Sequence, residues 1–249
     1  MTLSPNYEPS MPHAASPYEP RNQEYLRSLE RRVLDHPVLQ HPLVRAFGSG
    51  TLSFEQVRRF GLLYYPHIQR TRLYQAAALS ISLDEPLQWA LASILADEFA
   101  CIEGRVEPSR THPAIYRQFL RALGYSETDW ADPPIIPELK SYIETHYALC
   151  ARHHPLTAIG CAGLAMEWPI PPLYRRLVAG LRRFDVLDDH ALELFLGHID
   201  IDIEHGQMIR TALEPHLDEA LHREHLERGI FESLDARYRL MTGLERAII

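Results

Sequence analysis

Hydrophobic positions along most of this chain recur every three or four residues, which is the spacing of an amphipathic helix. Tyr25, Leu26, Leu29 and Val33 form the first such stripe. Comparable stripes predict longer helices over 53–79, 84–98, 137–150, 155–167, 191–212 and 219–240, with shorter ones over 114–123 and 172–184. No segment alternates with the period of two expected of a strand, and no hairpin turn pair is present. The pattern therefore predicts an all-α fold.

Capping residues and prolines place several helix ends. Ser53 and Gln56 have the spacing of a capping box, so we expect a helix to begin directly after Ser53. The prolines within 169–172 predict a break in the helical pattern. Asp188 or Asp189 is expected to cap the helix that follows.

The start of the chain differs from the rest in composition. Residues 1–21 contain five prolines and few aliphatic side chains, so we expect a flexible N-terminal tail there. The remaining residues, 22–249, are of a length that one hydrophobic core can fill. We therefore expect a single helical domain after the tail.

Charge and composition narrow the class of protein. The net charge of −8 and a pI near 5.9 argue against a nucleic-acid partner, which would need a basic face. No apolar run reaches the roughly 18 residues of a membrane span, and the first residues lack a signal-peptide pattern. Cys101, Cys150 and Cys161 are an odd number without a CxxC pair. We expect reduced, mostly buried thiols in a cytoplasmic protein.

The strongest chemical signal is a histidine and carboxylate stripe near the C-terminal third. His198, Asp202 and His205 stand at positions i, i+4 and i+7, so a helix places all three on one face. Two imidazoles and a carboxylate are ligands suited to non-haem iron. The stripe lies inside the apolar segment 191–212, which is expected to face the bundle core.

A site for two irons needs further carboxylate and imidazole ligands. Glu167 ends an apolar segment in which a carboxylate has no obvious access to solvent, and metal ligation would make its burial tolerable. Glu98 follows a second apolar segment, and His112 could supply another imidazole. Each candidate also has a purely structural interpretation. The stripe would be a helix face with an incidental His–Asp pair, and Glu167 would be a buried carboxylate paired with an arginine such as Arg175. Glu98 and His112 would be exposed residues at helix ends.

Four motifs in this order resemble the haem-oxygenase-like di-iron oxidases, which share a fold with the PQQ-synthesis oxidase and thiaminase II. The resemblance covers about residues 25–215 and implies an all-α, haem-oxygenase-like bundle of about seven to eight helices. The motifs are Asp97-Glu98, then His112-Pro113, then a lone Glu167 in an apolar helix, then Phe195 followed by H-x3-D-x2-H. The resemblance implies that the iron ligands are Glu98, His112, Glu167, His198, Asp202 and His205.

The loop between the first two motifs departs from the family pattern. In the family this loop is usually shorter and richer in glycine, whereas here 14 positions separate Glu98 from His112 with Gly104 as the only glycine between them. Glu103 or Glu107 is therefore an alternative to His112, or an additional ligand.

The resemblance also implies an activity. It implies a cofactor of two iron ions, Fe(II) or Fe(III), with O2 as co-substrate and an external reductant. Members desaturate, cleave, rearrange or N-oxygenate amino acids, so we expect a small amino acid or amino-acid-derived substrate, in natural-product biosynthesis. No catalytic residue beyond the metal ligands is predicted. Tyr64, Tyr65 and His67 are candidates for substrate binding, because their helix is expected to pass the pocket.

Other activities stay open at this stage. Some members cleave fatty acids, and others make 4-aminobenzoate from a protein side chain with a tyrosine and a nearby lysine. The latter is weakened here, because the only lysine, Lys140, lies well before Glu167. A cofactor-free enzyme of the same fold and a non-catalytic metal-binding bundle are further alternatives. The apolar terminal helix, 219–240, could pack internally or form a homodimer.

Overall fold

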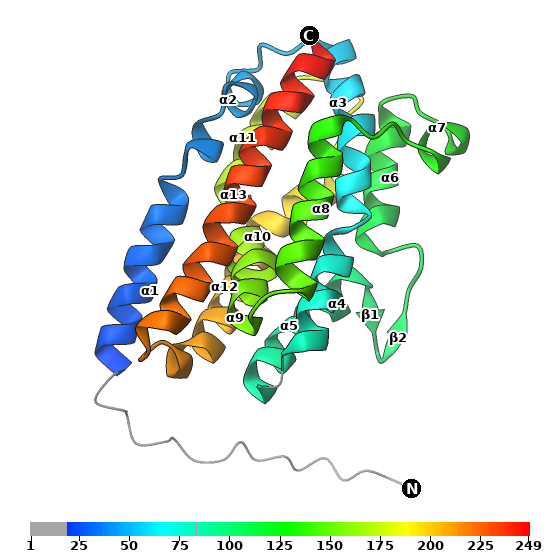
Figure 1. Ribbon diagram of the computed structural model, residues 1–249. Helices are drawn as coiled ribbons and strands as arrows, with labels where there is room; N and C mark the ends of the chain where they lie inside the picture. Colours follow the sequence, from blue (N-terminus) through cyan, green and yellow to red (C-terminus); the bar gives the residue numbers. More distant parts are fainter. Residues whose placement is uncertain (1–18, 83) are drawn as a thin grey trace, which may run out of the picture.

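The structure is a computed structural model that describes residues 19–82 and 84–249. Long helices run side by side in a bundle, with the C-terminal helix in the middle of the view in Figure 1. The elements in chain order are α1 (Glu19–Leu34), η1 (Pro37–Gln40), α2 (Pro42–Gly48), α3 (Phe54–Ile68), α4 (Thr71–Ile81), α5 (Glu85–Glu98), β1 (Cys101–Ile102), β2 (Arg105–Val106), α6 (His112–Ala122), α7 (Glu127–Ala131), α8 (Pro137–Ala151), α9 (Pro155–Ile159), η2 (Gly160–Leu164), α10 (Ala165–Glu167), α11 (Ile170–Leu181), α12 (Glu193–Leu213), η3 (Glu214–His216) and α13 (Ala220–Ile248).

The predicted helical pattern is confirmed, and its boundaries follow the expected local chemistry. Ser53 and Gln56 form the capping box, with each side chain bound to the other residue's backbone N–H. Pro169 does lie in the break between α10 and α11, whereas Pro171 and Pro172 lie in the first turn of α11. The predicted cap of α12 is wrong: Asp188 accepts a hydrogen bond from the backbone N–H of Ala191 in the preceding turn, and the N-cap of α12 is Leu192, which makes no side-chain cap. The predicted tail lies, apart from its last three residues, outside the described residues, and α1 already begins at Glu19.

The chain forms more helices than the seven or eight expected. The predicted helix over 53–79 is divided into α3 and α4, because the backbone N–H of Arg70 bonds to the carbonyl of His67, three residues back, in place of that of Pro66. Arg70 donates a hydrogen bond to the carbonyl of Pro66, 2.8 Å away, at this break. The short helices η1, α2 and α7 are too brief to produce a readable hydrophobic period.

The expectation that the chain has no hairpin is wrong. Residues Cys101–Ile102 and Arg105–Val106 pair antiparallel as β1 and β2. Glu103 and Gly104 connect them with φ angles of 50° and 77°, the consecutive positive values of a tight hairpin turn. Two-residue strands are too short to show an alternating pattern. This hairpin occupies the unusually long segment between Glu98 and His112.

The C-terminal helix α13 packs closely against the segment that leads to Glu167. A Cβ placed on Gly160 would lie 2.4 Å from the carbonyl oxygen of Leu226, and one on Gly229 would lie 2.0 Å from that of Thr157. Glycine at both positions therefore allows the backbones of α13 and of 155–164 to approach directly. This contact places the buried end of α10 beside the middle of α13.

Within the same segment, Gly160–Leu164 form a π-helical turn between α9 and α10. A continuous α-helix was expected over 155–167. A π-turn accommodates one extra residue in a helix and often occurs at functional sites. Here it shortly precedes Glu167.

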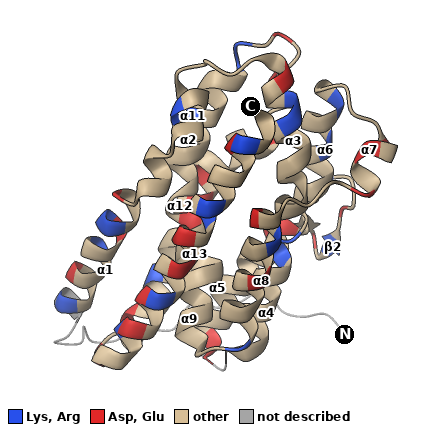
Figure 2. Ribbon diagram, turned by 45° about the horizontal axis from the view of Figure 1, so that its top comes forward, with Lys and Arg blue, Asp and Glu red and all other residues tan. Residues whose placement is uncertain are grey.

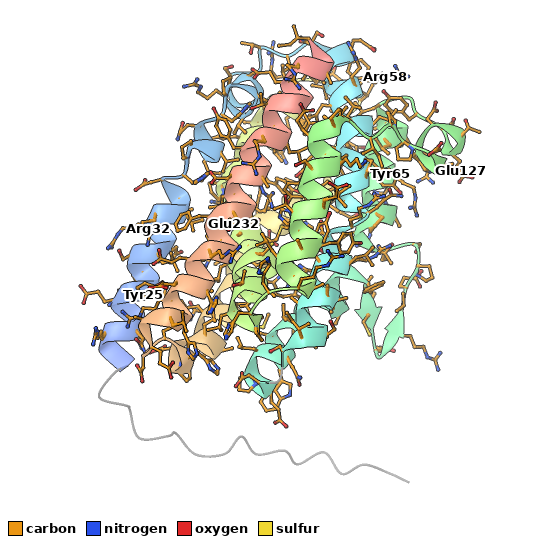
Figure 3. All side chains as sticks on the ribbon, in the orientation of Figure 1. Tyr25, Arg32, Arg58, Tyr65, Glu127 and Glu232 are labelled. Carbon is orange, nitrogen blue, oxygen red and sulfur yellow. The ribbon has the colours of Figure 1, made fainter. Side chains whose placement is uncertain are left out.

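Charged residues of both signs mark the outward-facing parts of α1 and α13 in Figure 2. Figure 3 labels Tyr25 and Arg32 on α1, and both side chains bind Glu227 of α13, at 2.9 and 2.8 Å. These contacts hold α1 against the bundle. No helix in the described part of the chain combines the length and apolar character needed to cross a membrane. The three cysteines are free, Cys101 at the surface and the other two in the interior.

Candidate metal centre

The six predicted ligands lie in two groups of three on facing helices. Glu98 ends α5, His112 begins α6, and His198 comes from α12; Glu167 ends α10 and faces Asp202 and His205 of α12. Within each group, one potential ligand atom from every residue lies within 4.8 Å of the others. The i, i+4, i+7 stripe on α12 therefore contributes one residue to the first group and two to the second.

The first group contains two imidazoles and a buried carboxylate. His112 Nδ1 lies 2.9 Å from Glu98 Oε2, and the rings of His112 and His198 have centroids 4.5 Å apart. His198 Nδ1 donates to the carbonyl of Leu194 at 2.6 Å, so its Nε2 carries the free lone pair. Glu98 Oε2 is buried without a well-aligned hydrogen bond. These atoms are therefore available to a cation.

The second group is organised around His205. Its Nδ1 lies 3.4 Å from Glu167 Oε2 and 4.0 Å from Asp202 Oδ1, while its Nε2 lies 2.8 Å from Asp97 Oδ2. Because Asp97 accepts the proton of Nε2, the Nδ1 lone pair is directed toward the two carboxylates. Asp97 is adjacent to Glu98 but was not predicted to have this positioning role.

Burial perturbs the titration of both groups. Burial, with the neighbouring Glu167 carboxylate, raises the pKa of Asp202 well above its usual value, and burial likewise raises the pKa of Glu167. Burial and the adjacent His112 lower the pKa of His198 to about 3. Crowded buried carboxylates need compensating positive charge, which protons or cations can provide. Three carboxylates and three imidazoles on two facing triads fit a pair of iron ions by donor type.

A small cavity, lined mostly by buried residues, adjoins both groups. Its volume of about 40 Å³ gives room for a few water molecules. Besides the ligands, its wall includes His67, Thr71, Gln75, Tyr174 and Arg237. Glu167 and Asp202 also line a larger hollow of about 480 Å³ between α1, α11 and α12. These two carboxylates therefore lie between the two spaces.

The three predicted substrate-binding residues occupy different positions. His67 lines the cavity, and Tyr64 packs against it with ring centroids 4.9 Å apart. Tyr65, labelled in Figure 3, instead accepts a hydrogen bond from Arg117 and stacks on Tyr116, so it does not line the cavity.

The alternative ligands lie elsewhere. Glu103 and Glu107 are exposed on and beside the hairpin, and Glu107 accepts a hydrogen bond from the Ser109 hydroxyl. The sequence left open a pairing of Glu167 with Arg175. In the structure, the close partner of Glu167 is His205. Lys140 is 73% exposed, pairs with Glu144 and is not among the residues that line the cavity.

Sequence reasoning missed Arg237, a fully buried residue of α13 that lines the cavity. A signal was present, because Arg237 stands three residues after Leu234 and three before Leu240, on the apolar face of the terminal helix. A charged residue in such a stripe is unusual enough to mark a site.

Comparison with known proteins agrees with this architecture. Residues 58–238 match the family described as iron-containing redox enzymes. The chain is 24% identical over 231 residues to a 4-aminobenzoate synthase of Nitrosomonas europaea, covering 88% of this chain and 90% of that protein. It is 23% identical over 244 residues to a 4-chloro-allylglycine synthase of Streptantibioticus cattleyicolor, covering 97% and 90%.

A solved domain of unknown function from Shewanella denitrificans, described as having a haem-oxygenase-like fold, superposes with a TM-score of 0.67 at 14% identity. The match covers 91% of each chain, so the predicted fold class is confirmed. The family match extends over most of the bundle, including all six candidate ligands. The chain belongs to the family of iron-containing redox enzymes and has a haem-oxygenase-like fold.

Proposed function

We propose that this protein is a non-haem di-iron oxidoreductase that uses O2 to transform a small amino acid or amino-acid-derived substrate. The observation that carries the proposal is the pair of three-residue groups, five of whose six members line one cavity. Glu98, His112 and His198 would hold one iron, and Glu167, Asp202 and His205 the other.

When bound, iron supplies the electrons for reaction with O2. The protein's own groups prepare the site for it. Asp97 and the Leu194 carbonyl fix which nitrogens of His205 and His198 face inward. Most residues that line the cavity are themselves buried, so they would limit the access of bulk water and place the substrate beside the ligands. Return to the reduced state requires an external reductant.

The size of the cavity and the named products of two relatives support the substrate class. A cavity volume of about 40 Å³ favours a small molecule over a long fatty-acyl chain. Both relatives are named for products that contain an amine and a carboxylate. The surface position of Lys140 favours an external substrate over one built from the protein's own lysine. These features support a role in the synthesis of natural products.

The test is anaerobic titration of the metal-free protein with Fe(II), followed by Mössbauer spectroscopy and stopped-flow mixing with O2. We expect two irons per chain and rapid oxidation of both. Asp202→Ala and Glu167→Ala should lose this behaviour, whereas Asp200→Ala, an exposed carboxylate on the same helix, should retain it.

Two results would overturn the proposal. Folded protein that takes up no iron would favour a cofactor-free enzyme of the same fold, especially if the metal-free chain were active. Protein that binds iron without oxidation by O2, in the presence of a screen of amino acids, would favour a metal-binding role.

A further inference from the structure

The guanidinium of Arg237 is buried in the interior with little to bind. Arg237 lies on α13 and is 1% exposed. Its Nη2 donates to the thioether sulfur of Met166 at 2.8 Å. Nε and Nη1 have no hydrogen-bond partner among the described residues. A thioether is a weak acceptor, so this contact does not satisfy a buried cation. Leaving such a charge without a counter-ion is costly.

Arg237 lines the same cavity as five of the six candidate ligands. Two other lining residues also have unpartnered buried atoms: His67 at Nδ1 and Gln75 at Oε1. The carboxylates nearby are those of the two ligand groups, which a metal would engage. The cavity therefore has a free cationic donor, one acceptor oxygen suited to an N–H group, and a histidine nitrogen whose role depends on its tautomer.

Charge balance makes an anion the natural complement. Two divalent iron ions carry four positive charges, and the three ligand carboxylates carry three negative charges. One positive charge is left over, and Arg237 adds a second. Asp97, bound to His205 at the edge of the site, offsets only one of these. A loaded site thus has excess positive charge in a space with low access to water, where a bound anion would be stabilised.

We propose that Arg237 is a substrate-binding residue that recognises the carboxylate of the substrate. The inference rests on the proposed function, because it names the group by which a substrate of that site would be held. The free Nε and Nη1 donors supply charge-assisted hydrogen bonds to the carboxylate oxygens. The Oε1 acceptor of Gln75 lies in the same cavity wall, where an amine of the same molecule would find a partner.

The test compares Arg237→Met with Arg239→Met, a control on the exposed face of the same helix. The full chain, loaded anaerobically with Fe(II), is titrated with acetate and with its neutral analogue acetamide at constant ionic strength, by calorimetry and thermal unfolding. We expect wild type and Arg239→Met to bind acetate more tightly than acetamide. Arg237→Met should lose about ten- to a hundredfold in acetate affinity, as for a hydrogen bond to a charged group, and bind acetamide nearly unchanged.

Iron uptake separates this inference from the proposed function. Arg237→Met should bind as much iron as wild type, because Arg237 is not a ligand. If wild type takes up no iron, the function fails, and the acetate titration repeated on the metal-free chain still reports on Arg237. Equal acetate affinity in wild type and Arg237→Met would overturn the inference.

A purely structural role for Arg237 is tested with a second variant and with a measurement that needs no substitution. If Arg237→Met does not fold, Arg237→Lys, which keeps the charge, is measured in its place and should retain part of the acetate affinity. The wild-type chain loaded with Zn(II) and carrying ¹⁵N-arginine provides a measurement without any substitution. Acetate should shift one guanidinium Nε resonance protected from solvent exchange, and the absence of any such shift would overturn the inference.

Discussion

His205 Nε2 lies 2.8 Å from Asp97 Oδ2, so a half-exposed carboxylate on α5 determines which nitrogen of a buried imidazole on α12 faces the site. Removal of Asp97 should weaken metal binding without removing a ligand. We expect Asp97→Ala to lower the affinity of the second group for Fe(II) by about ten- to a hundredfold, as for other partners of ligating histidines. Fe(II) titration measures this, and Asp200→Ala should match wild type.

The stability of the metal-free chain should fall as pH rises. The Glu167 and Asp97 carboxylates outweigh the burial of His205 and raise its pKa to about 9, so its contribution is complete below the unfolded value of about 6.5 and is lost as pH rises through about 9. The raised pKa of Asp202 acts in the same direction, because the folded state holds a proton that the unfolded chain has released. Urea unfolding between pH 6 and 10 measures the decline, and His205→Gln should flatten its upper part. An increase of stability over this range in the wild-type chain would contradict the assignment.

The hairpin carboxylates provide a direct test of the ligand set. His112→Ala should release one iron per chain, because its imidazole lies within the first group. Glu103→Ala and Glu107→Ala should bind iron as wild type does, since both side chains are exposed on or beside the hairpin. Iron counted by Mössbauer spectroscopy distinguishes the two outcomes. Loss of iron on substitution of either glutamate would show that the hairpin contributes a ligand.

Close backbone packing against α13 predicts a strong effect at one glycine. Gly160→Ala would place a Cβ 2.4 Å from a backbone oxygen of α13, and rigid backbone cannot yield as a side chain does. We expect a loss of at least about 1–3 kcal/mol in the free energy of unfolding, measured with urea. Gly197→Ala, on α12, is the matched control. Its Cβ would meet nothing within 4 Å, so the free energy of unfolding should be unchanged or increased. Equal stabilities of the two variants would contradict the packing described.

The sequence contained most of the candidate site, because its strongest part is local. His198, Asp202 and His205 share a face by helical geometry alone. Glu98, His112 and Glu167 were candidates from their sequence surroundings, and the family resemblance joined all six into one ligand set. Arg237 was missed because a buried charge becomes significant only when its neighbours are known. Asp97 has a role only through His205, which is more than a hundred residues away. Those relationships depend on tertiary packing and leave no periodic signal.

The same limit applies to the fold. The all-α class followed from periodicity over long segments, and the capping box at Ser53 marked its helix correctly. The β1–β2 hairpin and the break after Ile68 involve a few residues each, so the hydrophobic pattern did not contain them.

The π-turn at Gly160–Leu164 has a consequence for the register of α10. Each residue of a helix turns the chain by about 100°. Deleting one residue from this turn would restore a regular helix and rotate everything between the deletion and Pro169 relative to α12. Glu167 would then point away from Asp202 and His205 although every side chain was still present. The direction in which the Glu167 carboxylate points thus depends on the number of residues that precede it as much as on their identity.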